Sequence, residues 1–495
     1  MNQRGLYFKF LLPIFASVLT ICSSQVYAAT QNCSNSFLST HPHNVLNCYI
    51  TSSQKPSWNL VSSDKNKDET IYHYDLTSQF WPPQDVSNFG TEWHHQLDVI
   101  VPKQIKNKQS LLFITGGKNR DKNESLLTAR TISSSGSSTI TETQVAAAVS
   151  EEFGSIVAVL KQVPNQFISF EDGVPRQEDG IIAYSWNRFM DDPTHGKYWP
   201  AHIAMTKAAV SAMNLIQSEA ARQGYIQPQH FIVSGASKRG WITWLTALAD
   251  QRVNAIIPMV IDIFNVKHNL EHIYKAYNDW PDAFNDFVEQ GVTNRLQTPE
   301  FTQLMNIEDP VSYMNVTKYR KRLSIPKLII NASSDEFFPP DSLQQYIRFI
   351  PGDNLFHTEA NQSHHIQGSL NLFALISNFY QMVLDKANFP KVSWEPDYQH
   401  HIIKIKTDFI PVGSVTLWKA FNPQKRDFRK KTTGAKYIDA TFEGGQCDKQ
   451  THSCVFTLNQ DSLKTGFTAR YLDFTFNDTK GHALDLTSPV FINQK

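Results

Sequence analysis

The segment from His230 to Leu245, HFIVSGASKRGWITWL, constrains the fold of this chain more than any other. Residues 231–233 form a short apolar run, which is typical of a buried strand. Gly235 and Gly240 bracket a tight turn that carries Ser237, and the apolar residues after the turn recur at helical spacing. The pattern therefore predicts a buried strand, a sharp turn with Ser237 at its apex, and then a helix.

A serine on such a strand-to-helix turn is how α/β-hydrolases expose a nucleophilic hydroxyl. The first N–H groups of the helix would face any negative charge that forms near Ser237. The usual G-x-S-x-G pattern has Arg239 in its last place here, and glycine follows one residue later. Because the backbone is crowded at such a turn, we expect the Arg239 side chain to point outward. A serine that only caps the helix is the alternative interpretation.

Residues 1–28 have the features of a secretory signal. Arg4 and Lys9 provide positive charge, an apolar run follows, and small residues surround a cleavage point after Ala28. The run is too short to span a membrane, and the bulky residue before Cys22 argues against a lipoprotein signal. We therefore expect a secreted or periplasmic protein that is not inserted in a membrane.

Four cysteines remain after this leader: Cys33, Cys48, Cys447 and Cys454. An even number in an oxidising compartment predicts two disulfides. The local pairs Cys33–Cys48 and Cys447–Cys454 are the simplest connectivity, and long-range pairs stay open at this point. The absence of a C-x-x-C motif argues against a zinc or redox site.

The charges of the chain are balanced, with 46 basic and 46 acidic residues. Loss of the leader would leave 44 basic and 46 acidic residues, because the leader contains Arg4 and Lys9 and no acid. Such a balance gives no field that would attract nucleic acid or an anionic membrane.

Continuous apolar runs alternate with amphipathic segments between about residues 68 and 390. This alternation predicts an α/β-hydrolase-like domain with a mainly parallel sheet, whose strands we expect at 111–115, 156–160, 231–233, 255–261, 328–332 and, last, 346–350. In such a sheet the chemistry collects at the carboxyl ends of the strands.

Three further segments flank or interrupt this domain. Residues 29–67 are polar and turn-rich, which predicts a surface arm pinned by a disulfide. Residues 267–319 are rich in aromatic side chains and predict a helical cap that shapes a substrate pocket, an ordinary packed helical layer being the alternative. Residues 391–495 contain short β-like segments, which predict a C-terminal antiparallel β-sandwich.

The acid and the base that would activate Ser237 should follow it in the chain, in the order serine, acid, histidine. Asp335 lies just beyond the apolar run that ends at Ala332, where this fold holds its acid. Its neighbour Glu336 and the earlier Asp262 are the alternatives.

The base should follow the last strand of the sheet, and the segment there offers three histidines. We choose His364, which lies in a polar loop just before a predicted helix, over His365 and His357. A buried carboxylate would fix the tautomer of this imidazole.

An oxyanion hole needs two N–H donors. We expect one to be the backbone N–H of Lys238, the residue after the nucleophile, and the other to come from Gly117 in the FITGGKN loop. The Lys238 and Arg239 side chains would attract an anionic substrate group or, as we prefer, form an outward-facing charged pair.

Two adjacent histidine pairs invite a metal-site interpretation. Neighbours in sequence rarely bind one ion together, and His94 and His95 fall on a strand, where consecutive side chains face opposite sides. We therefore expect neither pair, including His364 and His365, to bind a metal, and we expect no cofactor.

Several motifs together resemble the family of PhoPQ-activated pathogenicity-related proteins. They are ITGG near Gly116, SWNRF from Ser185, VSGASKRGW around Ser237, IDIFN from Ile261, and the NASSDEFF and NQSHH segments. The resemblance extends from about Tyr72 to Phe389 and implies an exported, virulence-related protein with an α/β-hydrolase-like core. It does not imply a particular substrate.

The sequence thus predicts an exported serine hydrolase that cleaves an ester or peptide bond in a small-molecule substrate. Because a fold does not fix a function, a non-catalytic extracellular binding or signalling protein on the same scaffold is the alternative. A third hypothesis gives the β-rich tail from about Trp394 to Lys495 a contact with a glycan or a cell surface.

Overall fold

The structure is a computed structural model that describes residues 1, 32–52, 54–85, 87–119, 142–366, 370–397, 399–434, 436–459 and 465–494. The chain divides into two units, residues 1–32 and residues 33–495, and the second contains every element discussed below. The leader predicted at residues 1–28 falls outside the described residues except for Met1.

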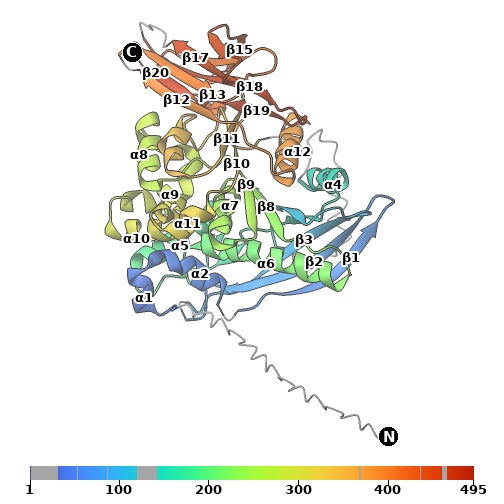
Figure 1. Ribbon diagram of the computed structural model, residues 1–495. Helices are drawn as coiled ribbons and strands as arrows, with labels where there is room; N and C mark the ends of the chain where they lie inside the picture. The colour runs from blue at the N-terminus through green and yellow to red at the C-terminus, as the bar shows by residue number, and fades with distance from the viewer. Residues whose placement is uncertain are drawn as a thin grey trace. The chain divides into compact units, whose positions relative to one another are not determined.

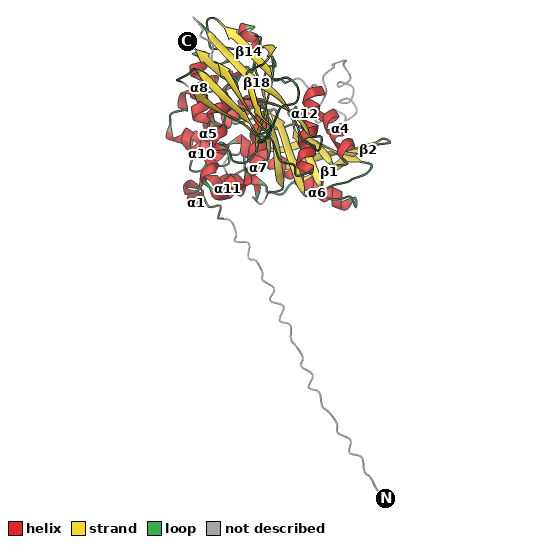
Figure 2. Ribbon diagram, turned by 45° about the horizontal axis from the view of Figure 1, so that its top comes forward, coloured by secondary structure: helices red, strands yellow, loops and turns green. Residues whose placement is uncertain are grey.

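A nine-stranded sheet forms the centre of the second unit (Figures 1 and 2). Its strands lie in the order β1 (Ser57–Lys65), β2 (Glu69–Trp81), β3 (Thr91–Pro102), β5 (Val157–Leu160), β4 (Gln109–Ile114), β8 (His230–Ala236), β9 (Val253–Met259), β10 (Lys327–Ala332) and β11 (Asn354–Glu359). The pairings from β1 to β5 are antiparallel, and those from β5 to β11 are parallel. The predicted, mainly parallel sheet is confirmed.

Both faces of the sheet are buried, because consecutive side chains of a strand enter different cores. In β4, Leu112 and Ile114 belong to one hydrophobic core, whereas Leu111 and Phe113 belong to the other. The first core also contains residues of α2 (Val45–Ile50), α5 (Glu178–Asp191), α6 (Ala201–Arg222) and α7 (Lys238–Ala249). The second contains residues of α4 (Glu142–Phe153) and α12 (Leu370–Leu384). The continuous apolar runs in the sequence reflect this two-sided burial.

A helical insertion separates β9 from β10, as the sequence predicts. It comprises α8 (Val266–Tyr277), α9 (Asn285–Glu289), α10 (Pro299–Glu308) and α11 (Thr317–Arg322), which form one yellow-green to yellow group in Figure 1. Its aromatic side chains join the first hydrophobic core, among them Phe284, Phe301 and Tyr313.

Two antiparallel sheets make up the C-terminal region. One has the order β12 (Val392–Asp397), β13 (Ile402–Thr407), β17 (Ser453–Asn459) and β16 (Gly445–Asp448). The other has the order β15 (Ile438–Thr441), β14 (Thr416–Asn422), β18 (Phe467–Asn477) and β19 (Ala483–Thr487), with β20 (Phe491–Gln494) also on β18. Side chains of both sheets share the second core with α12. The short elements that remain are α1 (Asn35–Thr40), β6 (Ile168–Ser169), β7 (Pro175–Arg176) and α13 (Lys430–Thr433).

The last strand of the large sheet is not where the sequence analysis places it. Residues 346–350 lie in and around two short 3-10 turns, and the strand is Asn354–Glu359, which pairs in parallel with β10. The apolar run exists because Tyr346 and Ile350 are buried in the first core. The Tyr346 hydroxyl also donates a hydrogen bond to Asp262 at 2.6 Å. Burial alone therefore does not distinguish a strand from a packed turn.

Residues 29–67, which the sequence analysis predicts to be a surface arm, contain more regular secondary structure than their composition suggests. Residues 57–65 form β1, the edge strand of the large sheet, and the helix α2 before it is buried. Most side chains of β1 are exposed, so an edge strand of this kind has the polar composition of a loop.

Each disulfide joins two cysteines that follow one another along the chain, Cys33 to Cys48 and Cys447 to Cys454. The simplest connectivity is therefore correct, and it fits a protein of an oxidising compartment. Among the described residues, we find no helix whose length and apolar character would let it cross a membrane.

Candidate active site

Ser237 lies at the apex of the turn between β8, an interior strand of the large sheet, and the helix α7. Its backbone has φ 58° and ψ −130°, a conformation that L-residues rarely adopt. Close contacts on both sides explain the flanking glycines. A Cβ on Gly235 would lie 2.8 Å from the Arg239 backbone, and one on Gly240 would lie 2.7 Å from Ile261. The crowding at Gly240 explains why this position holds glycine.

The side chains of Lys238 and Arg239 do not point outward, which corrects the sequence interpretation. They are 8% and 12% exposed, and both pair with Glu178, at 2.8 Å from Lys238 and 2.5 Å from Arg239. Lys238 also lies 3.2 Å from Asp179. The expectation of an outward orientation rests on the crowded backbone of the turn, but both side chains find an acidic partner, Glu178, at the start of α5.

Glu178 is held in its charged form by these two cations. Burial raises the pKa of its carboxyl, but the charges of Lys238 and Arg239 and their hydrogen bonds outweigh this effect and lower the pKa to about 2. The carboxylate therefore stabilises the folded protein above about pH 4.5, and this contribution is lost as the pH falls toward 2.

We expect Glu178→Gln to lower the free energy of unfolding at pH 7 by about 3 kcal/mol, because it leaves two buried cations without their main partner. The difference from wild type should shrink when denaturation is measured below pH 4. Glu171→Gln is the control: Glu171 has the same 32% exposure and pairs with Arg188 at 3.0 Å, where both side chains reach solvent. That variant should lose less than about 1 kcal/mol. Equal losses in the two variants would contradict this account.

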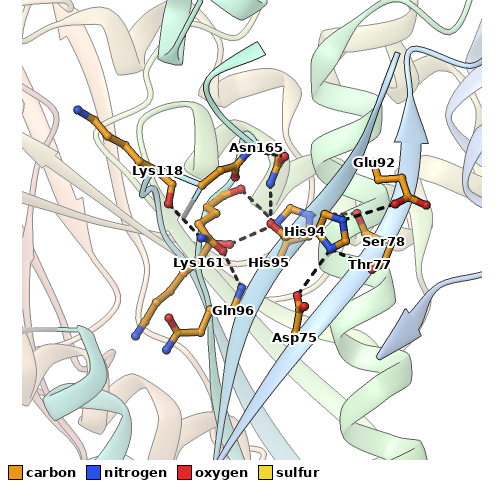
Figure 3. Close-up of polar contacts among 12 residues, drawn as sticks. Asp75, Thr77, Ser78, Glu92, His94, His95, Gln96, Lys118, Lys161 and Asn165 are labelled. Carbon is orange, nitrogen blue, oxygen red and sulfur yellow. Dashed lines mark hydrogen bonds and ion pairs between the residues drawn. The ribbon is translucent and has the colours of Figure 1, made fainter. Parts of the chain in front are cut away.

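The glycine loop after β4 lies directly beside this charged cluster. A Cβ on Gly116 would come within 2.5 Å of the Arg239 guanidinium, so a larger residue there would displace this side chain. Gly117 has φ 131°, which also favours glycine. Gln162, just beyond the end of β5, holds this loop: its backbone N–H donates to the Gly116 carbonyl at 2.9 Å, and its side-chain amide donates to the carbonyl of Lys118 at 3.0 Å. Lys118 is shown in Figure 3.

His364 and Asp335 form a buried hydrogen-bonded pair. The distance from His364 Nδ1 to Asp335 Oδ2 is 2.9 Å, and the two side chains are 7% and 4% exposed. The other oxygen of Asp335 accepts the backbone N–H groups of Phe337 at 2.7 Å and Phe338 at 3.2 Å. The ring of Phe337 also packs against the imidazole, with 4.3 Å between centroids. These contacts fix the carboxylate and the ring against each other.

The Nε2 atom of His364 is buried and has no hydrogen-bond partner among the described residues. Because Nδ1 faces a carboxylate, it carries the proton of the neutral ring, and Nε2 keeps its lone pair. This nitrogen can accept a proton from a hydroxyl that comes within reach. His364 and Ser237 line the same cavity, which has a volume of about 800 Å³.

The alternative acids have other partners. Glu336 accepts the backbone N–H of His364 at 2.8 Å and so holds the same loop from the other side. Asp262 accepts hydrogen bonds from the Tyr346 hydroxyl and the Asn331 amide, both at 2.6 Å. Burial raises the pKa of Asp262 to about 7 despite these hydrogen bonds, and the charge of Asp335 adds to the rise.

The alternative bases are also placed differently from His364. His365 is exposed and lines the cavity of Ser237. His357 lies on β11, where its ring contacts the Asp485 carbonyl at 2.9 Å and Glu359 at 3.2 Å.

His94 is exposed and its neighbour His95 is buried, as expected for side chains that alternate along a strand. Figure 3 shows polar contacts of both residues. His95 is fully buried, contacts the Ser78 hydroxyl at 2.9 Å, and its pKa is lowered to about 4 by burial. His94 is half-exposed and lies near Glu92 at 3.6 Å. Within the described part of the chain, no group of three or more metal-ligating side chains is gathered in one place.

Sequence reasoning missed the residues that support this site from a distance. Glu178, Gln162 and Phe337 reach it from segments whose local patterns carry no catalytic signal. An acid pair at the start of a helix, as at 178–179, usually only complements the helix dipole. The contacts of Glu178 could be found only after the loop before α5 had been placed in space.

Comparison with known proteins gives one family and many structural neighbours. A family model described as PhoPQ-activated pathogenicity-related protein matches residues 46–429. Autocrine proliferation repressor protein A of Dictyostelium discoideum is 31% identical over 384 residues, which cover 75% of this chain and 73% of that protein.

Similar solved structures include acetyl xylan esterases from a Paenibacillus species and a Thermoanaerobacterium species. The first is 12% identical and covers 72% of this chain and 95% of its own, with a TM-score of 0.43. The second is 14% identical and covers 69% and 92%, with a TM-score of 0.40. A glucuronoyl esterase from Solibacter usitatus is 10% identical and covers 71% and 92%, with a TM-score of 0.38.

Proposed function

This chain belongs to the PhoPQ-activated pathogenicity-related protein family, and from that premise we propose that it is an exported serine hydrolase that cleaves an ester or a peptide bond. The observation that carries the proposal is the arrangement around one cavity. Ser237 lies on a strained turn at the end of β8, and His364, hydrogen-bonded to Asp335, lines the same cavity. Exposed nucleophiles of α/β-hydrolases occupy this position of the sheet.

In the proposed reaction, the Ser237 oxygen attacks the carbonyl carbon while Nε2 of His364 takes the hydroxyl proton. Asp335 holds the ring in the required tautomer and stabilises the imidazolium. The backbone N–H groups of Lys238 and Gly117 would bind the oxyanion. His364 then gives its proton to the leaving group, and a water molecule repeats the sequence to release the acid.

A fluorophosphonate probe tests the proposal directly, because it labels only an activated serine. We expect the folded wild-type protein to be labelled, and peptide mass mapping to place the label on Ser237. A folded protein that resists labelling, or a label on another residue, would overturn the proposal. A panel of esters and amides then separates esterase from peptidase activity.

The alternative function is extracellular binding or signalling without catalysis. The lack of a hydrogen bond from His364 Nε2 to any described residue favours it, and the amoebal relative is named as a proliferation repressor. A biological effect of this protein that persists in Ser237→Ala would support this second function, and its loss in that variant would exclude it.

Export rests on the signal-like composition of residues 1–28 and is supported by the two disulfides. We divide the mature chain into residues 29–67, a hydrolase-like domain at 68–390 that includes the cap at 267–319, and a tail domain at 391–495. The glycan or cell-surface contact of the tail is testable with the full chain on a glycan array. A virulence role rests on the family description alone.

A further inference from the structure

Ser237 lines two cavities that differ in size and in polarity. The larger, of about 800 Å³, also contains His364, His365 and the charged residues Glu178 and Arg239. The smaller, of about 40 Å³, is lined mostly by apolar side chains of α5, α7 and the cap, and His364 is not among the residues that line it. A carbonyl group that reacts with Ser237 would therefore have the large, charged cavity on one side and the small, mostly apolar cavity on the other.

The small cavity has a mainly aromatic and aliphatic lining, to which the ion-paired Asp179 and Lys238 also contribute. Trp186 and Trp241 contribute their indole rings, and the cap contributes Phe284 and Leu296. Each of these four side chains is at most 7% exposed. Such a surface favours an uncharged, apolar group, because a polar group would lose its hydration there. The free volume has room for only a few non-hydrogen atoms.

The buried residue Glu308 holds the indole rings of both Trp186 and Trp241 in place. The Glu308 carboxylate accepts a hydrogen bond from Trp186 Nε1 and one at 2.9 Å from the ring of His202, while its backbone carbonyl accepts Trp241 Nε1 at 2.7 Å. The His202 ring also stacks on Trp241, with 4.4 Å between centroids. Rotation of either indole would leave a buried partner unpaired, so the cavity resists widening.

The position of His364 decides which part of a substrate enters which cavity. In acyl transfer the histidine that takes the serine proton returns it to the leaving group. The leaving group must therefore lie on the side of His364, in the large cavity, and the acyl group lies in the small one. We propose that the small cavity is an acyl pocket that restricts substrates to apolar acyl groups of about two to four carbons. This inference rests on the proposed hydrolase function.

A series of p-nitrophenyl esters tests the inference on the wild-type protein. Because the leaving group is constant, kcat/KM reports on the acyl group alone. We expect acetate and butyrate to be hydrolysed at least about 100-fold better than octanoate. Equal values for butyrate and octanoate would overturn the acyl pocket while leaving the hydrolase function intact. Failure to hydrolyse any ester or amide, together with no probe label, would instead reject the hydrolase function itself.

A cap variant tests the location of the pocket. Leu296→Ala should raise the ratio of octanoate to acetate hydrolysis at least tenfold, because it lengthens the small cavity. Leu304→Ala is the matched control: Leu304 is fully buried in α10 of the same cap and lines neither cavity. The control should leave the ratio unchanged even if it lowers stability. A shift of similar size in both variants, or none in Leu296→Ala, would contradict the proposed location.

Discussion

Alanine at position 237 is expected to reduce the kcat/KM of this protein toward its best ester or amide substrate by about 10⁴-fold or more. The reason is that the Ser237 hydroxyl lies on the strained turn at the end of β8 and lines the cavity of His364. Alanine keeps the Cβ and the backbone demands of the turn, so the thermal midpoint should change little. Steady-state kinetics and a thermal melt of the same preparation measure both effects.

Ser234→Ala is the control for this variant. Ser234 lies on the same strand, is fully buried, and its hydroxyl donates to the Ile257 carbonyl at 2.9 Å. Losing that hydrogen bond should cost about 1 kcal/mol of stability while activity stays within about tenfold. Turnover retained by Ser237→Ala, or an equal loss in both variants, would contradict a nucleophilic role for Ser237.

The sequence is most informative where glycines that mark a turn and the order of the elements along the chain indicate the same structure. Gly235 and Gly240 mark a crowded turn between an apolar strand and a helix, and the structure contains that turn. The residues chosen as acid and base, Asp335 and His364, lie together although 29 positions separate them. Their places follow from chain order in the fold rather than from any local pattern, because loops at the carboxyl ends of neighbouring parallel strands converge.

The sequence is least informative where the burial or exposure of a segment gives it the composition that is typical of another kind of element. The run at 346–350 is apolar because it packs into a core, yet it forms turns and not a strand. Strand β1 is polar because it lies at an edge. The pairing of Glu178 with Lys238 and Arg239 joins residues about 60 positions apart through side chains alone. No periodicity records such a contact, so the orientation of the two cations could not be predicted.

Replacing Asp335 with asparagine is expected to lower kcat/KM by about 10³- to 10⁴-fold. The asparagine would have nearly the same shape and could still accept the backbone N–H groups of Phe337 and Phe338 through its carbonyl oxygen. Its amide would then face His364 Nδ1 as a donor, so that the ring would carry its proton on Nε2 and could not accept one from Ser237. Kinetics on the folded variant measure this effect.

Asp262→Asn distinguishes this role from a general effect of removing a buried carboxylate. Asp262 is buried and close enough to feel the charge of Asp335, but its hydrogen bonds go to Tyr346 and Asn331 and not to His364. Its replacement should change kcat/KM by less than about tenfold, because the His364 tautomer is not altered. If Asp262→Asn proved as damaging as Asp335→Asn, or Asp335→Asn remained fully active, Asp335 would not be the residue that orients the base.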